Sequence, residues 1–356
     1  MKRHLGVELL RMVSMFMILI LHILGNGGIL DNVRIGSLNY YFFWGLEVLC
    51  FVAVNCFSLI TGYFMSKGKW RIGKFLQLWV EVVFYSITLS FVAYFILGEI
   101  VPISMYADSL FPLFKKSYWF FSAYAGLFLF MPLLNKAING LTKKEMTYGV
   151  FVILILGSGS ILFRSDPFNL AEGYSMVWLI FMYFIGAFIR LHVNVDSINK
   201  KSIVGYYLGI NVVSLGFIAL RSMIGDFEGS RDTIWFIHYV SPLILASSIL
   251  LFIIFLKTPI NGKETSFLIE KIVPHSFAVY LIHTHPIIFY FMLKDRFIFL
   301  ANESIIMATI QVLLFAILIY LSCLLIDCIR SLLFQFLQVP NVTDKIGKKL
   351  HQLIGI

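Results

Sequence analysis

Long apolar runs separated by short charged breaks dominate the pattern of this chain. A hydrocarbon core of about 30 Å requires about 20 mostly apolar residues per helix, and the first run, residues 9–28, has this length. Comparable runs predict helices at 9–28, 42–65, 75–97, 118–135, 147–163, 177–190, 203–220, 234–256, 276–293 and 304–329. Backbone polar groups within a bilayer must be bonded inside their own segment, which favours helices. The pattern predicts an all-α polytopic bundle of about ten transmembrane helices.

Composition supports a membrane protein and excludes an ordinary soluble one. Of the 356 residues, 60% are hydrophobic and only 13% are charged, whereas soluble domains carry roughly 25% charged residues. No linker or internal repeat divides the chain, so we expect one transmembrane domain over 1–336 and a short cytoplasmic tail over 337–356. The four cysteines lie inside predicted helices without metal-ligand spacing, and no metal site is expected.

The distribution of lysine and arginine predicts the topology, because cytoplasmic loops carry an excess of both. With the N-terminus inside, 19 basic residues fall in the inner segments and 8 in the outer loops. We therefore expect a multi-pass protein of the cell membrane with both termini in the cytoplasm. The net charge of +9 follows from this orientation and gives no reason to expect nucleic acid as a partner.

The first predicted span, which contains ELLRMVSMFMILILHI at residues 8–23, carries ionisable side chains among apolar ones. Arg11 and His22 share one helical face and lie about 16 Å apart along the axis. Arg11 also lies one turn after Glu8, and this pair could serve only to hold Arg11 at the membrane surface. His22 is either a hydrogen-bonding residue between helices or part of a site, because ionisable groups deep in a bilayer are costly.

Several segments resemble the membrane acyltransferase 3 family. The first span is similar to the family's first span, in which Arg or Lys is followed by ten residues and His, here Arg11 and His22. Four further segments resemble family elements in the same order, namely FVAVNCFSLITGYFM, SYWFFSAYAGLFLFMPLLNKAI, YFIGAFI and SFAVYLIHTHP. The resemblance covers nearly the whole chain. Asn55 departs from it, since the family commonly has an aromatic residue there.

The resemblance implies transfer of an acyl group, usually acetyl, from cytoplasmic acyl-coenzyme A to a hydroxyl of a cell-surface or secreted glycan. Such a reaction needs a base for the hydroxyl proton, and a neutral histidine suits this task. His22 is the candidate base. The phosphates of acetyl-CoA require cations, for which Arg11 and the basic segment with Lys69, Arg71 and Lys74 are candidates. That segment could also serve only the inside-positive orientation.

Other polar and aromatic side chains are weaker candidates. Glu47 and His283, both inside predicted spans, are alternative catalytic residues or interhelical partners. Glu47 and Glu81 lie in the second and third predicted spans. Each could contact an arginine or orient a catalytic group, and structural pairing is expected for each. At the start of the fourth span, Trp119 and the preceding Lys116 are candidates for binding the sugar of a glycan or lipid-linked acceptor, although such tryptophans commonly anchor helices at the membrane interface.

Two rival functions fit parts of the pattern. A proton-coupled secondary transporter or a lipid or glycan flippase would also bury histidine and acids, but no repeat of two halves is visible. A regulatory sensor would need a signalling domain, and no loop or tail is large enough. Binding of acyl-CoA and transfer of its acyl group to a glycan separate the acyltransferase from both. The glycan, the hydroxyl, the choice between acetyl and another acyl group, and the oligomeric state are left open. The sequence also leaves open whether His22 acts only as a base or transiently carries the acyl group.

Overall fold

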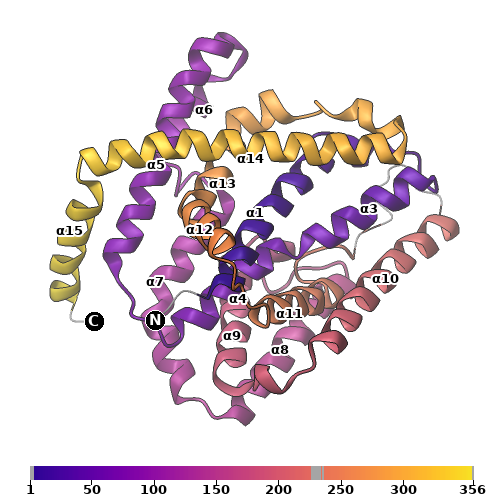
Figure 1. Cartoon of the computed structure of the whole chain (residues 1–356), viewed down its shortest axis with the longest axis horizontal. Coiled ribbons are helices and arrows are strands. Elements are labelled where there is room, and N and C mark those ends of the chain that lie inside the picture. Colours follow the sequence, from indigo (N-terminus) through magenta and orange to yellow (C-terminus); the bar gives the residue numbers. More distant parts are fainter. Residues whose placement is uncertain (1–3, 226–233, 235, 355–356) are drawn as a thin grey trace.

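The protein is a bundle of helices in the computed structural model, which describes residues 4–225, 234 and 236–354 (Figure 1). Helix makes up 80% of the structure and no strand occurs in the described part. The longer helices are α1 (Leu5–Leu24), α3 (Leu38–Phe51), α4 (Ala53–Met65), α5 (Ile72–Leu97), α7 (Trp119–Gly140), α8 (Lys143–Leu162), α9 (Met176–His192), α10 (Lys200–Ile224), α11 (Pro242–Leu256), α14 (Ile305–Phe336) and α15 (Val339–Ile354). Shorter ones are α2 (Ile29–Asn32), α6 (Ile103–Asp108), α12 (Lys263–Ile272) and α13 (Ser276–His283).

Seven of the described helical segments are long and apolar enough to cross a membrane. Two further apolar helices, α9 and α11, are shorter. The predicted class, an all-helical multi-pass membrane protein, is confirmed. The number of about ten spans and the cytoplasmic position of both termini stay predictions. Lys2, Arg3 and Arg231, which entered the charge distribution, lie outside the described residues.

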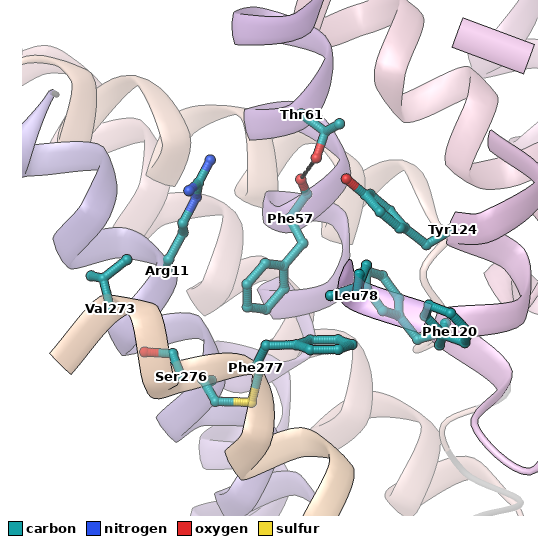
Figure 2. Close-up of a pocket in the computed structure, with 11 residues that line it drawn as sticks. Arg11, Phe57, Thr61, Leu78, Phe120, Tyr124, Val273, Ser276 and Phe277 are labelled. Atoms are coloured by element: carbon teal, nitrogen blue, oxygen red, sulfur yellow. Dashed lines mark hydrogen bonds between the residues drawn. The ribbon is translucent and has the colours of Figure 1, made fainter. Parts of the chain in front are cut away.

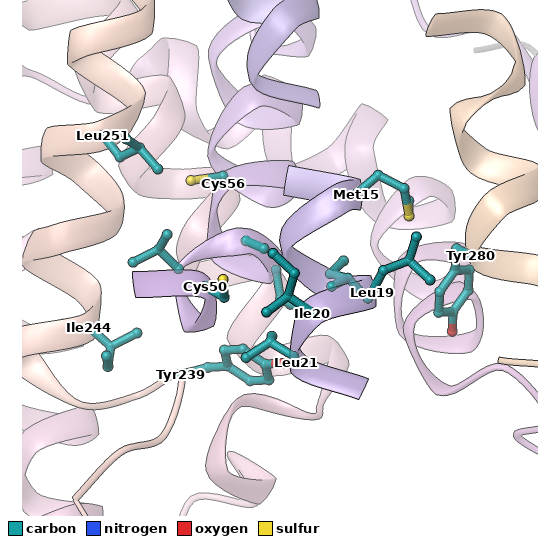
Figure 3. Close-up of a cluster of buried hydrophobic side chains, with 14 of the residues drawn as sticks. Met15, Leu19, Ile20, Leu21, Cys50, Cys56, Tyr239, Ile244, Leu251 and Tyr280 are labelled. Carbon is teal, nitrogen blue, oxygen red and sulfur yellow. The ribbon is translucent and has the colours of Figure 1, made fainter. Parts of the chain in front are cut away.

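Helix α1 lies at the centre of the bundle, in contact with α3, α4, α11, α13 and α14. Its apolar side chains are buried on several sides, including Leu10, Leu19, Ile23 and Leu24. In Figure 3, Leu19 and Ile20 of α1 lie between the cysteines of α3 and α4 on one side and Tyr280 of α13 on the other. The central position explains why this helix is apolar on nearly all faces.

Glycines bring α4 and α9 into close contact. A Cβ added to Gly62 would lie 2.0 Å from the carbonyl oxygen of Tyr183, and one added to Gly186 would lie 2.2 Å from that of Leu59. Small residues let membrane helices approach until their backbones touch. This contact holds α4 against α9.

The structure corrects three helix predictions in the C-terminal half of the chain. The span predicted at 276–293 is broken, because α13 ends at His283 and a short π-helix, Ile288–Leu293, follows Pro286. Proline lacks the N–H that a continuous helix requires. The span predicted at 304–329 continues to Phe336, so Arg330 lies inside α14, with its side chain 8% exposed, and is not a loop residue. The span predicted at 234–256 is helical from Pro242, and residue 235 lies outside the described residues.

The predicted tail contains an additional helix. Residues 339–354 form α15, which packs along α5. The two backbones nearly touch, because a Cβ added to Gly347 would lie 2.5 Å from the Cα atom of Gly73. In Figure 1, α14 runs across the bundle and α15 turns away from its end.

Candidate active site

Arg11 lines a cavity of about 280 Å³, called the Arg11 cavity below. Its walls come from α1, α4, α5, α7 and the start of α13, and Figure 2 shows Arg11 opposite Thr61 and Tyr124. Aromatic side chains form much of the remaining wall, namely Phe57, Phe120, Phe121 and Phe277. The guanidinium lies 3.3 Å from the carboxylate of Glu8, and the Arg11 side chain is 36% exposed. The pairing with Glu8 therefore leaves Arg11 accessible to a ligand.

His22 lies where two more cavities meet. A narrow one of about 70 Å³, the His22 neck, shares Met15, Phe57, Phe120 and Phe277 with the Arg11 cavity. A larger one of about 520 Å³, the Glu47 cavity, shares His22, Trp119, Tyr174 and Tyr239 with the neck. The three cavities follow one face of α1 in the order Arg11, Met15, His22, as its helical period predicts. His22 thus separates the two wide ends of this series.

The side chain of His22 is paired with His283 of α13. His22 Nδ1 lies 2.9 Å from His283 Nε2, and His283 Nδ1 contacts the carbonyl oxygen of Val279. Because a carbonyl only accepts, His283 Nδ1 carries a proton, and a neutral His283 then accepts at Nε2. His22 Nδ1 must be the donor, which leaves Nε2 of His22 without a proton. The pair thus assigns the tautomer of His22 in which Nε2 is the basic nitrogen.

The structure brings four of the predicted site residues together. Glu47, 6% exposed, and Trp119 line the same cavity as His22, and His283 is bonded to His22. His283 and His285 contact different neighbours, since His285 Nε2 lies 3.1 Å from Ser90 Oγ of α5. Of the two histidines, only His283 belongs to this site.

A family model described as an acyltransferase domain matches residues 4–328. The chain belongs to the acyltransferase 3 family. It is therefore a membrane acyltransferase, and the predicted resemblance is confirmed. Neither a curated protein nor a solved structure gives a significant match. The family match includes both histidines of the pair and ends before α15.

The remaining predicted cations lie apart from the cavities of the acyltransferase. Lys69, Arg71 and Lys74 are exposed around the start of α5, and none of them lines the Arg11 cavity. Lys116 is exposed, has a left-handed backbone with φ 52°, and lines a separate cavity of about 210 Å³ beside His285. The structure therefore groups Arg11 with the histidine pair but not these four residues.

The structure contains a second network of buried polar side chains, around Asp327, that was not predicted from the sequence. Asp327 of α14 is completely buried, and its carboxylate accepts from Tyr85 Oη at 2.7 Å and lies 2.6 Å from His275 Nδ1. Arg330 donates to both oxygens of the same carboxylate at 2.8 Å. Glu81, for which pairing with an arginine was predicted, lies 3.5 Å from Arg330. The spacing of Asp327 and Arg330, three residues apart in an apolar run, was the available signal.

The described residues contain no group of three or more His, Cys, Asp or Glu side chains that could hold a metal ion. The cysteines are all free, and Cys50, Cys56 and Cys323 are buried.

Proposed function

We propose that this acyltransferase moves an acyl group, in particular acetyl, from acyl-CoA in the Arg11 cavity to a sugar hydroxyl in the Glu47 cavity, with His22 as the base. The observation that carries the proposal is the His22–His283 hydrogen bond of 2.9 Å at the junction of the cavities. It supports a neutral His22 with a free Nε2 at the point where two substrates would meet. The acceptor is a cell-surface or secreted glycan, or its lipid-linked sugar precursor.

The Arg11 cavity suits the donor at both of its ends. The guanidinium offers two parallel N–H groups to a phosphate oxygen pair of CoA, and Thr61 and Tyr124 add hydroxyls. The aromatic wall formed by Phe57, Phe120 and Phe277 suits the thin, mostly apolar pantetheine arm. This arm leads along α1 to the His22 neck, about 16 Å from Arg11. Because CoA is cytoplasmic, we place the Arg11 end, and both termini, on the cytoplasmic side of the cell membrane.

The reaction then proceeds by attack of the acceptor oxygen on the thioester carbonyl. His22 Nε2 takes the hydroxyl proton as the new C–O bond forms, and the tetrahedral intermediate collapses with cleavage of the C–S bond. The leaving CoA sulfur receives the proton from His22, so His22 ends the cycle neutral. His283 holds the Nδ1–H of His22 and stabilises the imidazolium while it exists.

The test uses the full chain purified into lipid nanodiscs, with acetyl-CoA labelled in the acetyl group and a panel of saccharides. The parent protein should transfer label to a saccharide, and His22→Gln should bind acetyl-CoA but not transfer. His351→Gln, an exposed histidine of α15, is the matched control and should stay active. A parent protein that does not bind acetyl-CoA would contradict the assignment of acyl-CoA as the donor. Movement of saccharide across the bilayer without transfer would favour the transporter or flippase.

A further inference from the structure

The Glu47 cavity is acidic at its open end. Glu172, whose side chain is 62% exposed, lines it together with the buried Glu47. His238 Nδ1 lies 3.4 Å from the Glu172 carboxylate and lines the same wall. None of the described residues around this cavity is lysine or arginine. A substrate in this part of the cavity therefore lies beside the Glu172 carboxylate.

The loop before α9 holds Glu172 in this position. The carboxylate of Asp166 accepts from the backbone N–H groups of Leu170 and Ala171 at 2.7 and 2.6 Å. Ala171 and Glu172 have left-handed backbone conformations, with φ 47° and 55°, which residues other than glycine seldom adopt. Such conformations persist where the surrounding structure imposes them. The Glu172 carboxylate is therefore directed by its loop.

A buried donor in the same cavity lacks a partner. Trp44 of α3 is 2% exposed and lines the Glu47 cavity. Its indole Nε1 has no hydrogen-bond partner among the described residues. Buried indole N–H groups usually have one. Trp44 thus places an unused hydrogen-bond donor beside the Glu47 cavity.

Aromatic rings line the Glu47 cavity where it meets the His22 neck. The rings of Trp119 and Tyr174 have centroids 4.6 Å apart, and those of Tyr174 and Tyr239 are 5.0 Å apart. The face of a pyranose that carries C–H groups packs against such rings, while its hydroxyls point outward to acids and N–H donors. The cavity combines all three kinds of group.

We propose that Glu172 determines acceptor specificity, by accepting hydrogen bonds from an uncharged or amine-bearing saccharide and repelling one that carries a carboxylate or phosphate near the reacting hydroxyl. The proposal rests on the proposed function, since the Glu47 cavity is its acceptor site. Discrimination arises from the repulsive element as much as from the attractive one. Repulsion between Glu172 and a negatively charged saccharide also slows the association of that saccharide with the cavity.

The test measures binding of three disaccharides to the full chain in nanodiscs, separately from acyl transfer. The probes are a glucosamine disaccharide, an N-acetylglucosamine disaccharide and a disaccharide containing glucuronate. The parent should bind the first two at least about tenfold more tightly than the third. Glu172→Gln should reduce this ratio and Glu172→Lys should abolish or reverse it. Glu303→Lys, an exposed acid in the segment before α14, should keep the parent ratio.

Equal binding of all three probes by the parent, or a parent-like ratio in Glu172→Lys, would overturn the proposal. Thermal unfolding of each variant establishes that the fold is retained, and Glu172→Gln, which keeps the shape of the side chain, serves if the lysine variant does not fold. Discrimination in binding without any acyl transfer would refute the proposed reaction while leaving the specificity of the cavity intact. Transfer to all three probes at equal rates would refute the specificity proposed for Glu172 while leaving the proposed reaction intact.

Discussion

The bundle buries two polar clusters that differ in how completely they are satisfied. In the first, His22 and His283 share one hydrogen bond, and His22 faces two cavities. In the second, the Asp327 carboxylate contacts Tyr85, His275 and Arg330, and Glu81 lies 3.5 Å from Arg330. None of these five residues lines the Arg11 cavity, the His22 neck or the Glu47 cavity.

The comparison teaches that burial of ionisable groups in a membrane does not by itself mark an active site. A carboxylate with all its acceptor positions used has no capacity left for a substrate, and its removal exposes charges that were neutralised. A neutral histidine with one nitrogen held and the other facing a cavity has such capacity. The first cluster should therefore control activity and the second stability.

The largest expected effect is on catalysis, in His22→Gln. Glutamine can still donate to His283 but has no useful basicity, so the turnover rate should fall by about 10²- to 10⁴-fold with little change in thermal unfolding. The transfer of labelled acetyl under saturating acetyl-CoA measures it. Retention of parent activity would reduce His22 to an interhelical hydrogen-bonding residue and move the search for the base to Glu47.

A large effect on stability is expected in Asp327→Ala. The change leaves Arg330 and His275 without their buried carboxylate, and the free energy of unfolding should fall by about 3–5 kcal/mol. Denaturant titration in detergent measures it. Asp344→Ala, which removes an exposed partner of Lys348 at 3.2 Å, is the control and should change stability by less than about 1 kcal/mol. A folded, stable Asp327→Ala variant that has lost only activity would reverse the assignment of the two clusters.

A smaller effect on catalysis is expected at His283, because it acts through His22. His283→Ala should lower the turnover rate by on the order of 10²-fold through loss of orientation, while the KM for acetyl-CoA stays unchanged. His283→Gln keeps an acceptor for His22 Nδ1 and should recover part of the rate. Equal losses in both variants would show that the imidazole of His283 itself, rather than its hydrogen bond, is needed.

The smallest effect is expected at Arg11, at the far end of α1. Arg11→Ala should raise the KM for acetyl-CoA by about tenfold, as expected for loss of one charge-assisted hydrogen bond. Arg11→Lys should give an intermediate value, because lysine keeps the charge but not the planar fork. Glu8→Ala, which removes only the partner at 3.3 Å, is the control. An unchanged KM in both Arg11 variants would assign Arg11 to the helix and its Glu8 pair.

The membrane character, the helical class and the line from Arg11 to His22 could be predicted from the sequence alone. Run length and composition are local properties, and the bilayer imposes the length of each run. The helical period then places Arg11, Met15 and His22 on one face without knowledge of neighbouring helices. The cavities of the structure follow this face.

Pro286 was the available signal for the break in the span predicted at 276–293, since proline cannot continue a helix. The C-terminal end of α14, at Phe336, was predicted too early because Arg330 was expected to be the first residue of a loop. Its pairing with Asp327 explains why it lies inside the helix. Local charge counts cannot distinguish an arginine at the membrane surface from one neutralised inside the bundle, because the neutralising contacts come from Asp327 on its own helix and Glu81 on another.

The pairing of His22 with His283, across 261 positions of the chain, was decided by the packing of α13 against α1, as was the separation of Lys116 from the site. Sequence periodicity specifies which side chains share the face of one helix. It carries no information about which face of a distant helix meets them, because that depends on packing at every other contact of the bundle. The candidate base, His22, was therefore predictable as a residue, whereas its tautomer, its partner and the cavities that it separates required the assembled helices.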